Sequence, residues 1–232
     1  MNDLIRLWEV YTTRTDMILN GLTEHIFMTV VTMSIVLSIA IPLGIYLTRK
    51  QEFADPIIGV TGVFQTIPSI ALFGFLMPFV GIGLKPTIIA LVMFALLPVL
   101  RNVYTGIKEV DPFLVDAGKG MGMTDRQILM TIQLPLALPV IMAGIRTATI
   151  MTIGVATVAA FIGAGGLGEI IFRGVSLMRN ELTLAGAIPA AGLALTADFL
   201  LKKIEKWVSP HKRAKKVSLK PKQVQITENN TA

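Results

Sequence analysis

Residues 110–139 read VDPFLVDAGKGMGMTDRQILMTIQLPLALP and separate two long apolar segments. The polar part of this stretch is too long for a tight turn, and its pattern predicts two short helices. Asp111-Pro112 can begin the first helix, Gly122 allows a sharp bend, and Thr124 can cap the second helix. With apolar residues along one side, a helix–glycine–helix of this kind is suited to docking into the groove of a partner protein.

Apolar segments dominate the remainder of the chain. Hydrophobic residues make up 53% of the 232 residues and charged residues only 16%, whereas soluble domains carry about 25% charged residues. A helix needs about 20 apolar residues to cross a bilayer. Segments that meet this length are 26–47, 57–80, 87–107, 136–162 and 182–201. We therefore expect an all-α membrane protein with five transmembrane helices, in which the neighbouring helices compensate for internal prolines.

Lysine and arginine concentrate on alternate connections between these segments. One set of connections carries Arg49 and Lys50, then all four basic residues between 101 and 126, and then every basic residue from Lys202 onward. The other set is poorer in basic residues. By the positive-inside rule the first set is cytoplasmic, so the N-terminus is expected outside and the C-terminus in the cytoplasm.

This orientation divides the chain into three parts. Residues 1–25 are expected to form an uncleaved extracytoplasmic segment, 26–203 the transmembrane domain with a cytoplasmic loop at 108–135, and 204–232 a basic, disordered cytoplasmic tail. The simplest interpretation of the tail is that it fixes orientation. A second hypothesis is that it leaves the anionic leaflet when ionic strength rises, because salt screens its attraction to lipid.

The stretch FIGAGGLGEI at 161–170 contains Gly163, Gly165 and Gly168 in the G-x-G-x-x-G spacing of a dinucleotide-binding turn. No strand precedes it, no acidic residue follows at the required distance, and it lies at the outer end of its segment, so that function is rejected. We instead expect a tight turn, including Gly166, where backbone re-enters a packed bundle and forms an outer gate.

Small residues recur at every fourth position of segment 136–162. They are Gly144, Ala148, Thr152, Ala156 and Ala160. This ridge has two interpretations: close packing against another helix, or the lining of a solute path that also uses threonine hydroxyls.

Two charged residues lie in or near the last two segments. Arg146 is costly inside a span and should either reach the cytoplasmic interface or pair with an acidic loop residue. Asp198 has Lys202 one turn away, so a local ion pair is expected there.

Several classes of function lack the residues they need. The chain has no cysteine and only two histidines, His25 and His211, which the sequence places outside the five segments. No carboxylate pair lies within the segments. We expect no catalytic residues, no metal site and no nucleic-acid partner, and the absence of an inverted repeat argues against a self-contained carrier.

The loop resembles the coupling loop of permease subunits in binding-protein-dependent ABC importers. That family has E-A-A, three residues, G, nine residues and I-x-L-P; here Asp116-Ala117-Gly118, Gly122 and Ile132-Gln133-Leu134-Pro135 keep the spacing. Asp116 replaces Glu, and Gly118 replaces the second Ala, which loosens the helix by roughly 1 kcal/mol. The resemblance implies the type I importer permease fold.

The resemblance covers about residues 25–205. Segments 54–76, 96–107 and 160–174 are similar to permeases that import glycine betaine, carnitine or choline, although the QTIPS run at 65–69 also resembles amino-acid importers. The resemblance implies a bacterial cell-membrane location, an external solute-binding protein, a second permease copy or related chain, and two ATPase subunits. ATP and Mg would bind those ATPase subunits, and no cofactor is expected in this chain.

The expected solute path uses polar residues of two segments. Gln65, Thr66 and Ser69 come from the second segment, and Thr149 and Thr152 from the fourth. No Trp/Tyr cage for a quaternary ammonium ion is visible, so selection is assigned to the external receptor. The alternative is a permease of the same architecture that imports an amino acid such as methionine.

Overall fold

The computed structural model describes residues 2–208, and these form helices without strands. The helices are α1 (Asn2–Thr13), α2 (Thr15–Arg49), α3 (Ala54–Thr66), α4 (Ser69–Val80), α5 (Leu84–Lys108), α6 (Pro112–Gly120), α7 (Asp125–Ile128), α8 (Leu134–Val158), α9 (Leu167–Ser176) and α10 (Asn180–Val208). The expected all-α membrane fold is confirmed. The predicted tail begins inside α10, and its remainder, 209–232, lies outside the described residues together with His211.

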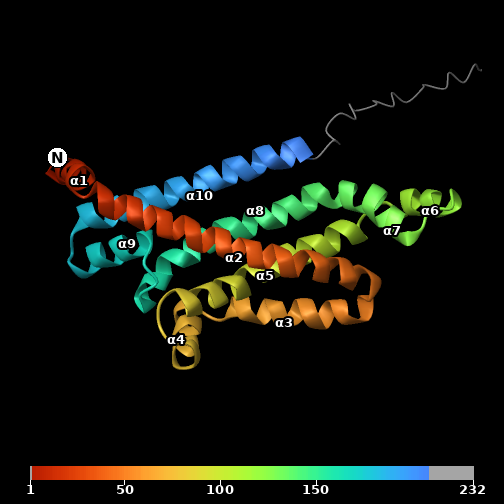
Figure 1. The fold of residues 1–232 in the computed structure, drawn as a ribbon, viewed down its shortest axis with the longest axis horizontal. Helices are drawn as coiled ribbons and strands as arrows, with labels where there is room; N and C mark the ends of the chain where they lie inside the picture. Colours follow the sequence, from red (N-terminus) through yellow and green to blue (C-terminus); the bar gives the residue numbers. More distant parts are fainter. Residues whose placement is uncertain (1, 209–232) are drawn as a thin grey trace, which may run out of the picture.

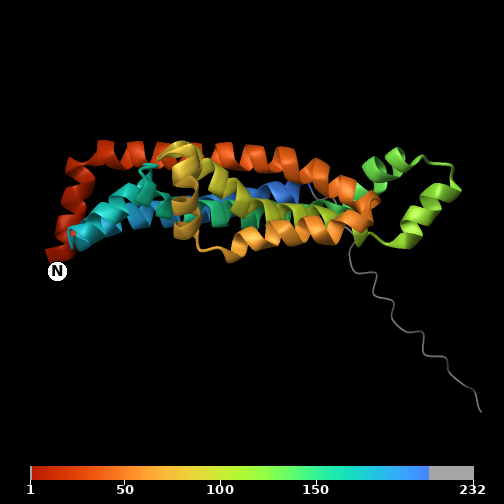
Figure 2. The same ribbon diagram turned by 90° about the horizontal axis from the view of Figure 1, so that it is seen from below.

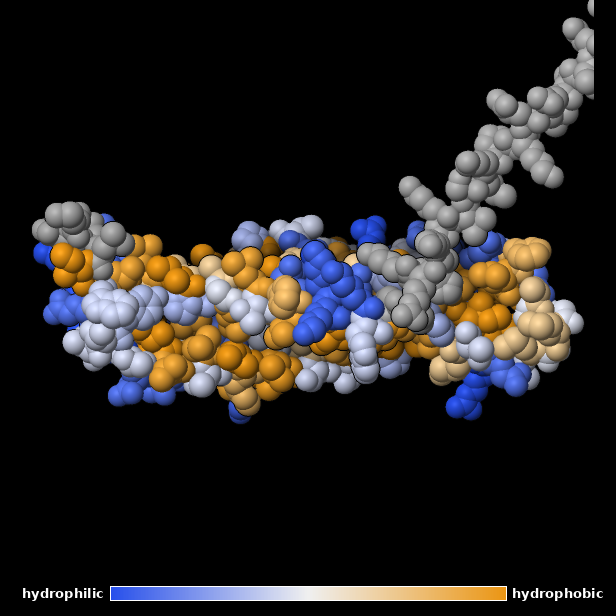
Figure 3. Space-filling model, turned by 90° about the horizontal axis from the view of Figure 1, so that it is seen from above, coloured by the Kyte–Doolittle hydropathy of each residue, from blue (hydrophilic) through white to orange (hydrophobic). Residues whose placement is uncertain are grey.

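The long helices run along one axis and form an elongated bundle (Figure 1). Helices α6 and α7 lie at one end of it, and α1 and α9 lie at the opposite end. Among residues 2–208, four helical stretches are long and apolar enough to cross a membrane, and one bent pair of helices makes a fifth span if it is counted as one. Hydrophobic residues cover much of the face in Figure 3, and a hydrophilic cluster interrupts them near the end of α10.

The second expected span, 57–80, is broken rather than continuous. Its halves α3 and α4 meet at a bend of 100°, so α4 lies across the bundle while α3 runs along it (Figure 2). Pro68 disfavours the helical conformation in the residue before it, and Ile67 is accordingly extended, with ψ 126°. The expectation that neighbouring helices would compensate for this proline was wrong, because the chain turns there instead.

The first span begins earlier than the sequence indicated. Helix α2 starts at Thr15 instead of residue 26, and α1 precedes it. Val10 of α1 packs in one apolar cluster with Leu167 and Leu182. Burial raises the pKa of the Tyr11 hydroxyl, which donates to a backbone carbonyl of α10 at 3.5 Å. The lead-in at 1–25 is therefore helical and packed against the far end of the bundle.

Helices α5 and α8 cross at small residues. A Cβ on Gly144 would lie 2.5 Å from the Asn102 Cβ and 2.7 Å from the Pro98 carbonyl oxygen, and one on Gly106 would lie 3.0 Å from the Val140 Cβ. Backbones can approach this closely only without the side chain. For Gly144, the first residue of the predicted ridge, this contact favours the helix-packing interpretation.

Helix α8 is continuous with α7. A π-helical segment, Leu129–Gln133, joins them, so the helical stretch runs from Asp125 to Ile162 over 38 residues. Pro135 has no N–H to donate to a carbonyl one turn earlier, and the Leu134 N–H bonds back five residues to the Leu129 carbonyl. The backbone hydrogen bonds therefore reach back five residues instead of four just before the proline, and the helix continues without a break.

Candidate functional site

The predicted helix–glycine–helix is confirmed at the α6–α7 end. The Asp111 carboxylate caps α6 by accepting from the Phe113 N–H at 2.9 Å. Gly122 has φ +78°, in the left-handed region that glycine adopts without strain. Thr124 and Gln127 form a reciprocal capping box, in which the Thr124 N–H donates to the Gln127 side chain at 2.8 Å. Each local signal in the sequence therefore has its expected partner.

The motif residues of this loop divide into an exposed and a packed group. Asp116 is exposed and pairs with Lys119 at 3.4 Å, and Ala117 is exposed beside it. Gly118 is buried, and a Cβ there would lie 2.9 Å from the Ile132 Cδ1. Glycine at this position therefore leaves space for Ile132, whereas Leu134 and Pro135 begin α8.

Exposed apolar residues on the loop are a feature that the motif did not single out. Phe113 is 76% and Met121 is 74% exposed, and both lie outside the helices that are long and apolar enough to cross a membrane. Exposed apolar residues that gather on a short segment mark a surface for a partner. Their signal in the sequence was their position beside the turns at Asp111 and Gly122.

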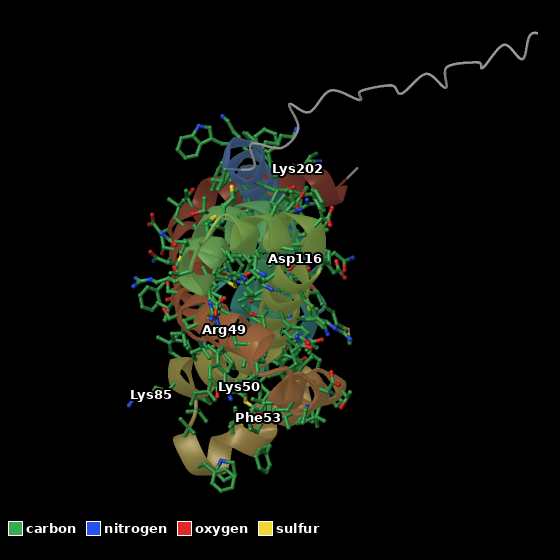
Figure 4. The ribbon with its side chains drawn as sticks, turned by 90° about the vertical axis from the view of Figure 1, so that its right-hand side faces the viewer. Arg49, Lys50, Phe53, Lys85, Asp116 and Lys202 are labelled. Carbon is green, nitrogen blue, oxygen red and sulfur yellow. The ribbon has the colours of Figure 1, made fainter. Side chains whose placement is uncertain are left out.

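A charged cavity lies between this loop and the bundle. It has a volume of about 540 Å³ and is lined in part by Arg49, Lys108, Asp116 and Asp125. Arg49, at the end of α2, pairs with the Asp125 carboxylate at 3.7 Å and donates to the Asp125 carbonyl at 3.3 Å. Figure 4 looks onto this end of the molecule, with Arg49 and Asp116 labelled. Arg49 thus ties the bundle to the start of α7.

The glycine-rich turn lies at the opposite end, between α8 and α9. Gly163, Gly165 and Gly166 have φ between +74° and +78°, whereas Gly168 is helical and its Cβ would overlap the Thr157 carbonyl. A tight turn is therefore present at Gly163, Gly165 and Gly166, whereas including Gly168 in it was wrong, because Gly168 belongs to α9. The role of the turn as a gate stays a prediction.

Two contacts from other parts of the chain hold this turn. The Gly166 N–H donates to the Glu24 carboxylate at 2.7 Å, and the Gly83 N–H donates to the Ile162 carbonyl at 2.7 Å. A Cβ on Gly165 would overlap the Glu24 carboxylate. The sequence analysis missed Glu24, because nothing local links it to a turn so distant along the chain.

His25 follows Glu24 and is fully buried in α2, so placing it outside the spans was wrong. Its Nε2 lies 3.0 Å from the Ile153 carbonyl oxygen, and the Nδ1 has no hydrogen-bond partner within the described residues. A Cβ on Gly166 would lie 3.2 Å from that Nδ1. His25 therefore contacts the same turn as Glu24, from within the bundle.

The expected path residues lie against different neighbours. The Gln65 Nε2 donates to the Phe94 carbonyl of α5 at 2.8 Å, and Thr66 and Ser69 flank the bend at Pro68. Thr149 and Thr152 donate to carbonyls of their own helix, and Thr152 also contacts the Met33 sulfur of α2. Their role in transport stays a prediction.

Arg146 pairs with α10 rather than with a loop. Its Nε donates to the Asp198 carboxylate, and its Nη1 lies 4.0 Å from the Glu205 carboxylate. The expected local pair of Asp198 with Lys202 was therefore wrong. An exposed pair one turn apart on a helix contributes little, whereas a half-buried guanidinium needs partners wherever the fold supplies them.

The helices, their order and the loop at the α6–α7 end define a class of protein. Residues 40–210 match the family described as binding-protein-dependent transport system inner membrane component, and the chain belongs to this family. It is therefore a multi-pass protein of the membrane and a transport permease.

Curated relatives carry more particular names. The carnitine transport permease OpuCB of Listeria monocytogenes is 46% identical over 187 residues, 81% of this chain and 86% of the relative. OpuCB of Bacillus subtilis, a glycine betaine/carnitine/choline permease, is 44% identical over the same share of each chain. OpuCD of L. monocytogenes serotype 1/2a, a carnitine permease, is 42% identical over 93% of this chain and 97% of the relative.

Solved structures agree on the fold. The chain is similar to a chain of the MetNI methionine ABC transporter in an inward-facing conformation, with a TM-score of 0.76 and 25% identity. That match covers 84% of this chain and 97% of the other. The type I permease architecture expected from the sequence is therefore confirmed.

Proposed function

We propose that this chain is the membrane subunit of an ATP-driven importer for a quaternary-ammonium osmoprotectant: glycine betaine, carnitine or choline. The observation that carries the substrate class is the 42–46% identity to permeases named for these solutes. The 25% identity to a methionine transporter supports the shared architecture, and an amino-acid substrate is the weaker alternative.

The coupling loop would dock onto the ATPase. Its two capped helices and left-handed glycine give a fixed shape, and the exposed Phe113 and Met121 supply an apolar contact. In this arrangement two ATPase subunits bind ATP and Mg, and this chain binds neither. A second permease, identical or related, completes the path.

The end that carries α1 and α9 would face outward and receive the solute from its receptor. This follows from the excess of Lys and Arg at the opposite end and the positive-inside rule. The turn held by Glu24 and Gly83 would then close the outer mouth. Gln65, Thr66, Ser69, Thr149 and Thr152 remain the proposed lining of the path.

The permease itself would bind its solute weakly. A deep binding site in a path slows release, and both tryptophans are highly exposed, at 71% for Trp8 and 87% for Trp207. Selection by an aromatic cage is therefore assigned to the separate receptor.

Uptake in reconstituted vesicles tests the proposal. The permease is assembled with its ATPase and receptor partners, and labelled glycine betaine, carnitine, choline and methionine are compared. ATP-dependent uptake of any of the first three supports the proposal, whereas uptake of methionine alone contradicts the substrate class.

Gly122→Asp tests the coupling step in the same system. Nothing lies within 4 Å of a Cβ at this position, so the new carboxylate projects outward into the docking surface. We expect normal insertion and no transport. Gly122→Asn is the matched control, because it places a side chain of the same shape at the same left-handed φ but adds no charge. Wild-type uptake by the Gly122→Asp variant would contradict the coupling assignment.

A further inference from the structure

A half-buried arginine of α8 faces two carboxylates of α10. The Arg146 guanidinium donates through Nε to Asp198, while its Nη1 is 4.0 Å from Glu205. The three side chains are 34%, 29% and 25% exposed. One contact is close and the other lies at the limit of an ion pair, so the two acids are not equivalent partners.

The two acids are placed as alternative partners along one face of α10. Glu205 lies seven positions after Asp198, which corresponds to about two helical turns and roughly 10 Å along the axis. Residues with this spacing return to nearly the same side of a helix. A guanidinium has five N–H donors in a planar fork, so it can bond to one carboxylate before it leaves the other.

An open groove lies beside this cluster. It has a volume of about 580 Å³, is bordered by α2, α8 and α10, and its walls include Ile145, Ala197 and Ile204. The contact of α8 with α5 is different, because a Cβ at Gly144 or Gly106 would meet backbone or Cβ atoms at once. Within the described residues no glycine of α8 or α10 makes such a contact across the α8–α10 interface, so α8 is fixed more closely against α5 than against α10.

Movement of the coupling loop reaches this contact directly, since α7 and α8 belong to one helical stretch, Asp125–Ile162. We propose that Arg146 is a positioning residue for ATP-coupled transport. It pairs with Asp198 in the arrangement described and with Glu205 when α8 shifts along α10. The second carboxylate keeps the guanidinium paired throughout the movement. This inference rests on the proposed function, because it requires a docked ATPase that moves the loop.

The test is the number of solute molecules imported per ATP hydrolysed, measured in vesicles for Glu205→Gln, Glu205→Asp and Asp198→Asn. We expect Glu205→Gln to assemble normally but to lower this ratio by about fivefold, because a half-buried guanidinium that loses its second partner disfavours the shifted arrangement. Glu205→Asp should restore most of the ratio because it keeps the charge. Asp198→Asn should also lower the ratio, since it removes the other partner.

Glu52→Gln, an exposed change between α2 and α3, is the matched control and should behave as the wild type. A wild-type ratio in Glu205→Gln overturns the inference. Loss of assembled complex in proportion to lost transport, with the ratio unchanged, also overturns it, because a static ion pair would behave in this way. Absence of ATP-driven uptake by the wild-type complex would instead contradict the proposed function.

Discussion

Gly144→Ala tests the close crossing of α5 and α8. The new Cβ would lie 2.5 Å from the Asn102 Cβ and 2.7 Å from the Pro98 carbonyl oxygen. Ordinary carbon contacts are about 3.5–4.0 Å, so the helices must separate by about 1 Å. Gly154→Ala is the matched control, because it lies on the same helix and nothing is within 4 Å of its Cβ.

The expected effects have opposite signs. Alanine favours a helix over glycine by about 1 kcal/mol, and both variants receive this gain. Overpacking costs typically 1–3 kcal/mol, and only Gly144→Ala incurs it. The two variants should therefore differ by about 1–3 kcal/mol in free energy of unfolding, with Gly154→Ala at or above the wild type.

The measurement is the apparent melting temperature of each purified variant in one detergent. A difference of 1 kcal/mol corresponds to about 2–4 °C for chains of 150–250 residues, so Gly144→Ala should melt several degrees below Gly154→Ala. Equal melting temperatures would refute the claim that backbone contact fixes this crossing. Uptake by Gly144→Ala should fall as well, since α8 carries the coupling loop.

Three further changes address the two ends of the bundle. Thr124→Ala removes the capping box and should weaken ATPase binding by about fivefold, because a helix cap contributes about 1 kcal/mol. Titration of the ATPase measures this affinity. Thr124→Ser keeps the capping hydroxyl and should bind normally. Glu24→Ala removes the acceptor for the Gly166 N–H and should raise the rate of ATP hydrolysis measured without receptor. Glu24→Gln keeps an acceptor and should not raise it. Equal rates of hydrolysis in the two variants would contradict the role of Glu24 in holding the turn. Gly118→Ala should change ATPase affinity little, because about 1 kcal/mol of higher helix propensity offsets the close contact of the new Cβ with the end of the Ile132 side chain. An affinity loss above tenfold in Gly118→Ala, with normal affinity in Gly120→Ala, would contradict this expectation.

The coupling loop was predictable because its signals are local. The acid–proline pair at Asp111-Pro112, the glycine at the bend and the threonine cap each act on residues two or three positions away. The five apolar segments were also predictable from length and composition. Their boundaries were less so, because the start of α2 mixes polar and apolar residues that only the packed bundle makes helical.

Long-range pairings were not predictable from the sequence. Asp198 pairs with Arg146, and Glu24 accepts a hydrogen bond from Gly166. Both contacts depend on how helices that are distant in the chain pack together. The break at Pro68 belongs to the same group. Apolar residues continue on both sides of it, and only the arrangement of the neighbouring helices decides whether such a proline is accommodated or turns the chain.

The helical stretch Asp125–Ile162 connects the two ends of the protein. Its 38 residues correspond to a length of about 57 Å at 1.5 Å per residue. It begins at the docking bend and ends directly before the glycine turn. If it tilts as one lever, a rotation of about 10° displaces one end relative to the other by roughly 10 Å over this length. A small rotation at the ATPase would thus suffice to move the outer turn, without any signal passing through the solute path.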